Sequence, residues 1–123
     1  MKGKKILLAE DDQFIVDIYT TKLKQAGFIV EVAEDGEEAL KKIKEKKPDL
    51  LLLDIVLPTM NGWEILRAIR QSKDLKDLPV IILSNLYQKE EVERGMKFGV
   101  LKYMIKAHHT PSEVVEEVKK VLT

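Results

Sequence analysis

Four consecutive leucines, Leu50–Leu53, are followed directly by Asp54. An uninterrupted apolar run of this length, preceded by Pro48, is typical of a strand that is buried on both faces of a sheet. The turn formers Pro58 and Gly62 come shortly afterwards, so we expect Asp54 where this strand meets its loop. Burying a carboxylate there is costly unless a partner or ligand uses it. The carboxyl ends of strands in open parallel sheets are where ligands bind.

Short apolar runs alternate with amphipathic stretches along the rest of the chain. The runs that we predict to be strands are residues 5–9, 28–33, 50–53, 80–83 and 102–105. The predicted helices are residues 13–26, 37–46, 62–71, a stretch through Val92 and Met96 that ends at Phe98, and a last helix after Thr110. Five alternating strands and helices favour an α/β fold, (βα)5, with a parallel sheet covered by helices on both faces.

Two details of the predicted helices can be checked directly. Thr110, Pro111 and Glu113 have the spacing of an N-cap, a first-turn proline and the third residue of a capping box, so they predict the start of the last helix. Trp63 lies beside the apolar stripe of residues 62–71, and we expect its ring to be half-buried.

The length and charge of the chain restrict its class. Its 123 residues suit a single domain, residues 1–123. The 21 basic and 21 acidic residues cancel, which argues against direct nucleic-acid binding, because such domains usually have a basic excess. The lack of cysteine excludes a disulfide framework, and the apolar residues 6–9 are too few for a signal peptide or a membrane span. We therefore expect a cytoplasmic protein without a membrane partner.

Acidic residues follow the first predicted strand and the third. Glu10, Asp11 and Asp12 come directly after residues 5–9, and right-handed crossovers in a doubly wound sheet would make that strand the neighbour of the one ending at Asp54. Carboxylates that converge in this way raise one another's pKa unless a cation intervenes. An all-oxygen site suits Mg²⁺, with Mn²⁺ as an alternative. The competing interpretation, which we favour for Asp12 alone, is that these residues cap the following helix.

Two further polar side chains are expected at strand ends. Ser84 ends the fourth strand and Lys106 follows the fifth. Taken separately, such a serine is more often a turn cap and such a lysine is more often solvated. Their placement at consecutive strand ends predicts that both face the same crevice as Asp54.

With these residues the chain resembles a response-regulator receiver domain of two-component signalling. The resemblance covers essentially the whole chain and rests on the acid pair, on Asp54 with Pro58 and Gly62, and on Ser84 and Lys106. It implies a flavodoxin-like doubly wound (βα)5 fold whose five parallel strands have the order 2-1-3-4-5. The single domain of residues 1–123 would then be one receiver domain.

The resemblance also implies a role for each residue of the acidic cluster. Asp54 corresponds to the phosphoacceptor of the family. Asp11 matches the direct Mg²⁺ ligand, Glu10 matches the ligand that usually acts through water, and the backbone carbonyl of Val56 matches a further metal ligand. No other cofactor is implied.

The remaining site residues resemble the switch of the family. Ser84 corresponds to the switch hydroxyl, Tyr103 to the aromatic residue that changes rotamer with it, and Lys106 to the lysine that pairs with the phosphoryl group. Val56 and Leu86 match the two rim positions of the site, and because both are apolar we expect slow self-dephosphorylation.

The function implied is that of a signalling switch. Asp54 would take a phosphoryl group, with Mg²⁺, from a sensor histidine kinase or a phosphotransfer protein. The output would be protein–protein contacts with an unknown downstream protein. We expect a monomer, with a phosphorylation-linked dimer as the alternative. We expect no enzyme activity beyond the chain's own phosphorylation and slow self-dephosphorylation.

The chain departs from the family pattern at two positions. Ala107 follows Lys106, where the family usually has a proline joined by a cis peptide bond. Without the proline, the peptide bond between Lys106 and Ala107 can be trans. Asn85 follows Ser84, where the family usually has a small residue. His108 and His109 offer a zinc or general-base site only if a third ligand exists, and we expect them to be solvated.

Three other interpretations are considered. The first is a receiver fold that binds partners without phosphorylation. Asp54, Asp11 and Lys106 argue against it, and Asn85 and Ala107 leave it open. The second is the excised N-terminal receiver of a longer regulator. The third, a flavin carrier of the same strand order, would require a hydroxyl-rich loop after the first strand, where this chain has acidic residues.

Overall fold

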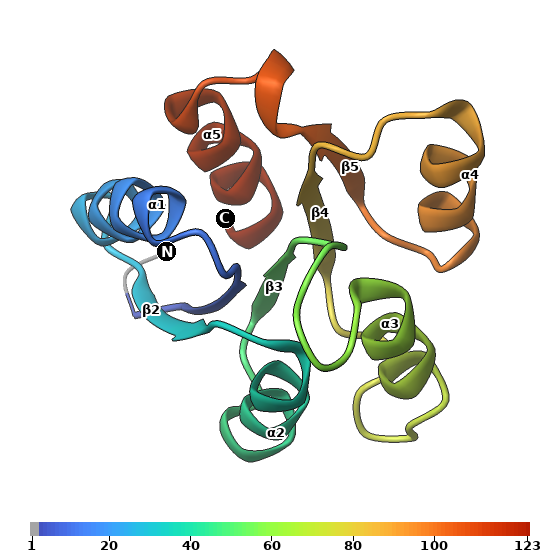
Figure 1. The fold of residues 1–123 in the computed structure, drawn as a ribbon. Helices are drawn as coiled ribbons and strands as arrows, with labels where there is room; N and C mark the ends of the chain where they lie inside the picture. Colours follow the sequence, from blue (N-terminus) through green and yellow to red (C-terminus); the bar gives the residue numbers. More distant parts are fainter. Residues whose placement is uncertain (1–2) are drawn as a thin grey trace.

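Strands and helices alternate along the described part of the chain, residues 3–123, in the computed structural model (Figure 1). Residues 1–2, which the predicted domain of residues 1–123 includes, lie outside the described part. The strands are β1 (Lys5–Ala9), β2 (Ile29–Ala33), β3 (Leu50–Leu53), β4 (Val80–Ser84) and β5 (Lys102–Ile105). The helices are α1 (Gln13–Gln25), α2 (Gly36–Lys46), α3 (Gly62–Arg70), α4 (Lys89–Lys97) and α5 (Pro111–Leu122), with a short 3-10 helix, η1 (Lys106–His108), before α5.

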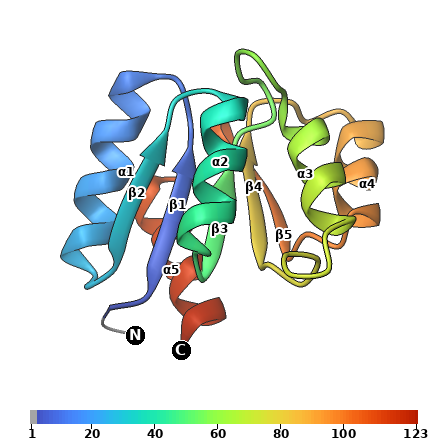
Figure 2. The same ribbon diagram turned by 90° about the horizontal axis from the view of Figure 1, so that it is seen from below.

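All strand pairings in the sheet are parallel, and the strand order is β2-β1-β3-β4-β5. The predicted fold class and strand order are therefore confirmed. Figure 1 and Figure 2 together show α1 and α5 on one face of the sheet and α2, α3 and α4 on the other. Because β1, β3, β4 and β5 are consecutive neighbours, the residues that follow them meet at one edge of the sheet.

The leucine run of β3 explains how one sheet supports two cores. Side chains alternate across a strand, so Leu51 and Leu53 pack among the residues of α2 and α3. Leu50 and Leu52 pack among those of α1 and α5 on the opposite face. All four are fully buried, and each contributes about 2 kcal/mol of hydrophobic stabilisation by transfer arithmetic. A polar residue at any of these positions would be buried in one of the cores.

Side chains cap the amino-terminal ends of α5 and α1. Thr110 Oγ1 accepts a hydrogen bond from Glu113 N at 3.1 Å, and Glu113 Oε1 accepts one from Thr110 N at 2.8 Å. The capping box predicted for the last helix is thus confirmed. Asp12 caps α1 by accepting from Phe14 N at 2.9 Å. The capping interpretation of Asp12 is therefore confirmed as well.

The prediction that Trp63 is half-buried is wrong. Its side chain is buried because the end of α4 packs on it: the Phe98 ring stacks at 6.2 Å between centroids. The Arg94 guanidinium lies 4.5 Å from the centre of the tryptophan ring. Met96, which lies on α4 as predicted, is half exposed.

At the amino-terminal ends of β4 and β5, Arg70 joins three segments of the chain. Its guanidinium donates hydrogen bonds to four backbone carbonyls, at 2.7 Å to Phe98, 2.8 Å to Leu78, 3.0 Å to Lys76 and 3.4 Å to Gly99. Burial lowers the pKa of Arg70, and Asp77 raises it in part. The end of α3 is thereby fastened to the loops that lead into β4 and β5.

The loop after β3 is fastened to the start of α2. Gly36 N donates to Pro58 O at 2.9 Å, and Thr59 Oγ1 donates to Asp35 Oδ1 at 3.2 Å. A β-carbon on residue 36 would lie 1.7 Å from the carbonyl oxygen of Met60, so only glycine fits there.

Within residues 3–123, none of the helices has the length and apolar character needed to cross a membrane.

Candidate functional site

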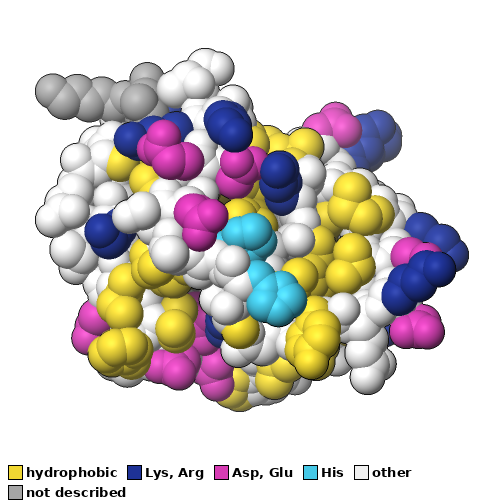
Figure 3. Space-filling view, turned by 90° about the horizontal axis from the view of Figure 1, so that it is seen from above, with side chains coloured by type: hydrophobic (Ala, Val, Ile, Leu, Met, Phe, Trp, Pro, Cys, Tyr) yellow, Lys and Arg dark blue, Asp and Glu magenta, His cyan; other side chains and the backbone are white. Residues whose placement is uncertain are grey.

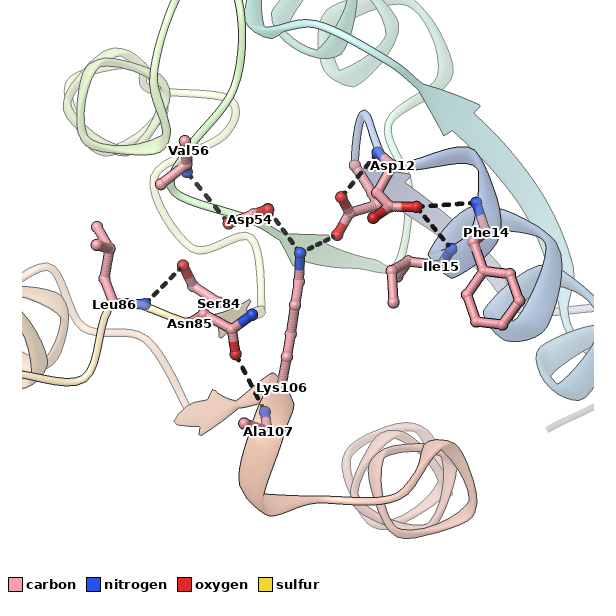
Figure 4. Close-up of polar contacts among 11 residues, drawn as sticks. Asp12, Phe14, Ile15, Asp54, Val56, Ser84, Asn85, Leu86, Lys106 and Ala107 are labelled. Carbon is pink, nitrogen blue, oxygen red and sulfur yellow. Dashed lines mark hydrogen bonds and ion pairs between the residues drawn. The ribbon is translucent and has the colours of Figure 1, made fainter.

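The predicted site residues converge at the carboxyl-terminal edge of the sheet. Glu10 follows β1, Asp54 follows β3, Ser84 ends β4 and Lys106 follows β5. All four line one crevice together with Asp11, Asp12, Val56, Asn85 and Leu86. Figure 4 shows the Lys106 side chain extending from η1 toward Asp54. The convergence that the strand ends predict is therefore present.

Lys106 is held between two buried carboxylates. Its Nζ lies 2.7 Å from Asp54 Oδ2 and 2.5 Å from Glu10 Oε1. Burial disfavours the ammonium, but the hydrogen bonds to Asp54 and Glu10 outweigh it, so the pKa of Lys106 is raised. For Glu10, which is 1% exposed, burial raises the pKa more than Lys106 and the N–H of Asp12 lower it. The contact with Glu10 was not expected from the sequence.

Both carboxylate oxygens of Asp54 have partners. Oδ1 accepts a hydrogen bond from Val56 N at 3.1 Å, and Oδ2 accepts one from Lys106 at 2.7 Å. The backbone continues the sheet, since Asp54 N donates to Ala9 O at 3.0 Å. The side chain is 7% exposed, and these two hydrogen bonds hold it in the crevice.

Three carboxylates form a group that could hold a cation. Glu10, Asp11 and Asp54 each offer an oxygen, and these oxygens lie within 4.8 Å of one another. Asp11 is exposed, whereas the other two are buried. The donor set is entirely oxygen and lies at a solvent-accessible edge, which suits Mg²⁺ or Mn²⁺. These residues therefore fit the predicted ion. Asp12 serves as a helix cap instead.

Ser84 and Tyr103 meet at the loop after β4. Ser84 is fully buried, and its Oγ accepts a long hydrogen bond, 3.4 Å, from Leu86 N. The Tyr103 hydroxyl donates to Leu86 O at 2.5 Å. Burial, with smaller effects of Glu91 and Asp54, raises the pKa of Tyr103 to about 12, so the phenol is a hydrogen-bond donor at neutral pH.

The two residues that depart from the family pattern contact each other. Ala107 N donates a hydrogen bond to Asn85 Oδ1 at 3.1 Å (Figure 4). No cis peptide bond occurs in the described residues, so the bond before Ala107 is trans. The sequence reasoning noted both residues and missed their contact. The signal was available in the adjacency of β4 and β5.

The histidine pair lies outside the crevice. Figure 3 shows the two histidines together at the surface, with apolar side chains on either side of them. His108 is exposed, and its ring is 5.9 Å from that of Tyr87. In residues 3–123, the only group of three metal-ligating side chains found is the carboxylate cluster, which does not include the pair.

Comparison with known proteins gives a consistent family. The family model of the response regulator receiver domain matches residues 6–119. The alkaline phosphatase synthesis transcriptional regulatory protein PhoP of Bacillus subtilis is 38% identical over 120 residues, which are 98% of this chain and 49% of that protein. The chain thus spans about half the length of the curated relatives it matches.

Solved structures agree. A putative response regulator from Chloroflexus aurantiacus has a TM-score of 0.89 at 31% identity, over 98% of both chains. The chemotaxis response regulator CheY4 of Vibrio cholerae has a TM-score of 0.88 at 28% identity, over 98% of this chain and 99% of that one. The likeness extends over the whole fold, including the edge that carries the crevice.

Proposed function

The chain belongs to the response regulator receiver domains of two-component signalling, and we propose that it is a phosphoacceptor switch in which Asp54 takes the phosphoryl group. The observation that supports this most is the ion pair of Lys106 with Asp54 inside a cluster of three carboxylates. A lone cation among acidic groups at the carboxyl ends of parallel strands is suited to bind a phosphoryl group next to its acceptor.

The proposed reaction makes one bond and breaks one. A carboxylate oxygen of Asp54 attacks the phosphorus of a phosphohistidine, and an O–P bond forms as the P–N bond breaks. The electron pair stays on the imidazole nitrogen of the donor, and the product is an acyl phosphate. A carboxylate is a weak nucleophile, so the rate depends on placement. The Val56 N–H and Lys106 provide that placement by fixing the Asp54 side chain.

Charge neutralisation is the second contribution. The Lys106 ammonium lies beside Asp54 and would pair with an oxygen of the incoming phosphoryl group. Glu10, Asp11 and Asp54, with the backbone carbonyl of Val56, would hold Mg²⁺, which when bound neutralises the negative charge of the phosphoryl oxygens. Asp11, the exposed member, remains open to solvent.

Switching would follow from new partners for two side chains. The phosphoryl oxygens would accept hydrogen bonds from Ser84 and Lys106, and Ser84 is already joined to Leu86. The Leu86 carbonyl is the acceptor of Tyr103. Movement of Ser84 would therefore change the position of the loop that Tyr103 contacts and so bias a two-state surface.

The proposed phosphoryl donor is a sensor histidine kinase or a phosphotransfer protein, and the output is a protein–protein contact. The named relatives are transcriptional or DNA-binding regulators about twice the length of this chain. That observation favours the second candidate, the receiver part of a longer regulator. Zero net charge still argues against nucleic-acid contacts by these 123 residues themselves.

Intact-mass measurement tests the proposal. Incubation with acetyl phosphate and Mg²⁺ is expected to add one phosphoryl mass, and Asp54→Ala is expected to add none. Asp74→Ala, an exposed aspartate in the loop after α3, is the matched control and should behave as wild type. A persisting adduct in Asp54→Ala would overturn the assignment. No adduct on wild type would favour the binding module that acts without phosphorylation.

A further inference from the structure

Three consecutive residues of the loop after β4, residues 85–87, each contact β5 or the residues that follow it. The contacts are Asn85 with Ala107, Leu86 with Tyr103 and Tyr87 with His108. The first two are hydrogen bonds, of 3.1 Å and 2.5 Å. The third is a tilted pair of rings 5.9 Å apart. The loop is therefore joined along its length to the segment that carries Lys106.

The contact of Asn85 has a local cause. Ala107 is the second residue of η1, and the first N–H groups of a helix have no partner within the helix. The Asn85 carboxamide oxygen supplies the missing acceptor from a different strand end. A proline at position 107 would have no N–H to donate. The two departures from the family pattern thus form a single contact.

This contact lies next to the two phosphoryl-binding side chains. Ser84 immediately precedes Asn85, and Lys106 immediately precedes Ala107, so the hydrogen bond from the Ala107 N–H to the Asn85 side chain links the two segments that carry them. We propose that Asn85 is a positioning residue: through the Ala107 N–H it holds Ser84 and Lys106 in a fixed relation, so that both close on a phosphoryl group as one unit. The inference rests on the proposed function of Asp54.

If Asn85 had a purely structural role, its loss would lower the melting temperature and leave the binding of a phosphoryl-like ligand unchanged. Asn85 and Ala107 are both exposed, and a hydrogen bond that competes with water adds little to stability. The consequence of losing it is therefore expected in the binding of a phosphoryl-like ligand and in the Ala107 amide, with little change in the melting temperature.

Amide hydrogen exchange of the whole chain tests the contact itself, independently of phosphorylation. In Asn85→Ala the Ala107 amide is expected to exchange severalfold faster, because local opening no longer has to break this hydrogen bond. Asn85→Asp keeps an acceptor oxygen and should restore slow exchange. Gln88→Ala, an exposed residue of the same loop whose side chain makes no capping bond, is the control. Equal Ala107 exchange in wild type and Asn85→Ala would overturn the inference.

Binding of beryllofluoride with Mg²⁺ tests the positioning role, because this anion imitates a phosphoryl group on a carboxylate. Asn85→Ala and Ala107→Pro are each expected to weaken binding about fivefold. The double variant should be no weaker than the weaker single variant, since both changes remove one interaction. Additive losses, or an Asn85→Ala affinity equal to that of wild type, would overturn the inference and leave the proposed function standing.

The two proposals can fail separately. If wild type neither binds beryllofluoride nor gains a phosphoryl mass, the proposed function fails, and the positioning role fails with it. If wild type does both and Asn85→Ala matches it, only the positioning role fails.

Discussion

Lys106 and Arg70 lie at opposite edges of the sheet and illustrate two uses of a partly buried cation. Lys106 contacts two carboxylates, Asp54 and Glu10. Arg70 contacts four backbone carbonyls. Both join segments that are distant in the sequence. The partners of Lys106 are charged side chains, which a metal ion and a phosphoryl group would engage in the proposed function, whereas the partners of Arg70 are backbone carbonyls.

The pKa shifts of the two cations follow from these partners. At Arg70 burial dominates and lowers the pKa. At Lys106 the hydrogen bonds to carboxylates exceed the effect of burial and raise the pKa. Charged partners therefore outweigh burial at Lys106, whereas the neutral carbonyl partners of Arg70 do not.

The largest effect on stability is expected at the Arg70 edge. Arg70→Met removes the donor of two part-buried carbonyls, those of Phe98 and Leu78. It should lower the free energy of unfolding by about 3 kcal/mol, since each unsatisfied buried group costs roughly 1–3 kcal/mol. Urea denaturation measures this, and Mg²⁺ should not restore the loss. Arg67→Met on the exposed face of the same helix is the control. A loss no larger than that of the control would contradict the fixed role of Arg70.

The next effect concerns the opposite edge, where a cation should stabilise the fold. Mg²⁺ relieves repulsion among Glu10, Asp11 and Asp54, and at ten times its Kd it should add about 1.4 kcal/mol. Thermal melts with and without Mg²⁺ measure the shift, which Asp11→Ala should abolish. An equal shift in Asp11→Ala, or none in wild type, would show that the cluster does not hold the ion.

A smaller effect is expected at the rim of the crevice. Val56 and Leu86 line the site, and neither can orient a water molecule for attack on the acyl phosphate. Replacing them with Asn and Lys should speed phosphate loss several-fold, which corresponds to roughly 1 kcal/mol of barrier. The decay of the phosphorylated mass after removal of the donor measures the rate. Decay at the wild-type rate would rule out shielding by these side chains.

The smallest effect concerns a surface cluster that joins α5 to the start of β5. Glu117 pairs with Lys102 at 2.8 Å and Lys120 at 2.9 Å, and these hydrogen bonds lower its pKa to about 2. Because the folded pKa lies below the unfolded value, the stabilisation is present above pH 4.5 and is lost as the pH falls toward about 2. Urea denaturation over this range should show a shallower pH dependence for Glu117→Gln. An identical slope would contradict the pairing.

The sequence was sufficient where the outcome depends on one segment or on the ends of strands whose order is known. The leucine run of β3 predicted a strand buried on both faces, and Thr110 with Glu113 predicted the start of α5. The convergence of Asp54, Ser84 and Lys106 followed from strand ends in a parallel sheet. The strand order itself came from the family resemblance.

Contacts between distant segments were not predictable in the same way. The burial of Trp63 depends on Phe98 and Arg94, which come about thirty residues later and reach it only through the packing of α4. The carbonyl partners of Arg70 leave no side-chain pattern in the sequence. The adjacency of β4 and β5 was predicted, but the contact of Asn85 with Ala107 also depends on η1, a short helix that was not predicted.

Trp63 is the only tryptophan of the chain, and its surroundings make it an optical probe of one contact. Its ring lies between α3, which carries it, and the end of α4, which covers it with Phe98 and Arg94. A displacement of α4 would expose the indole to water and shift its emission to longer wavelength while the rest of the fold stays intact. Native-state fluorescence of this chain therefore reports the position of one helix, and global unfolding should be followed by circular dichroism.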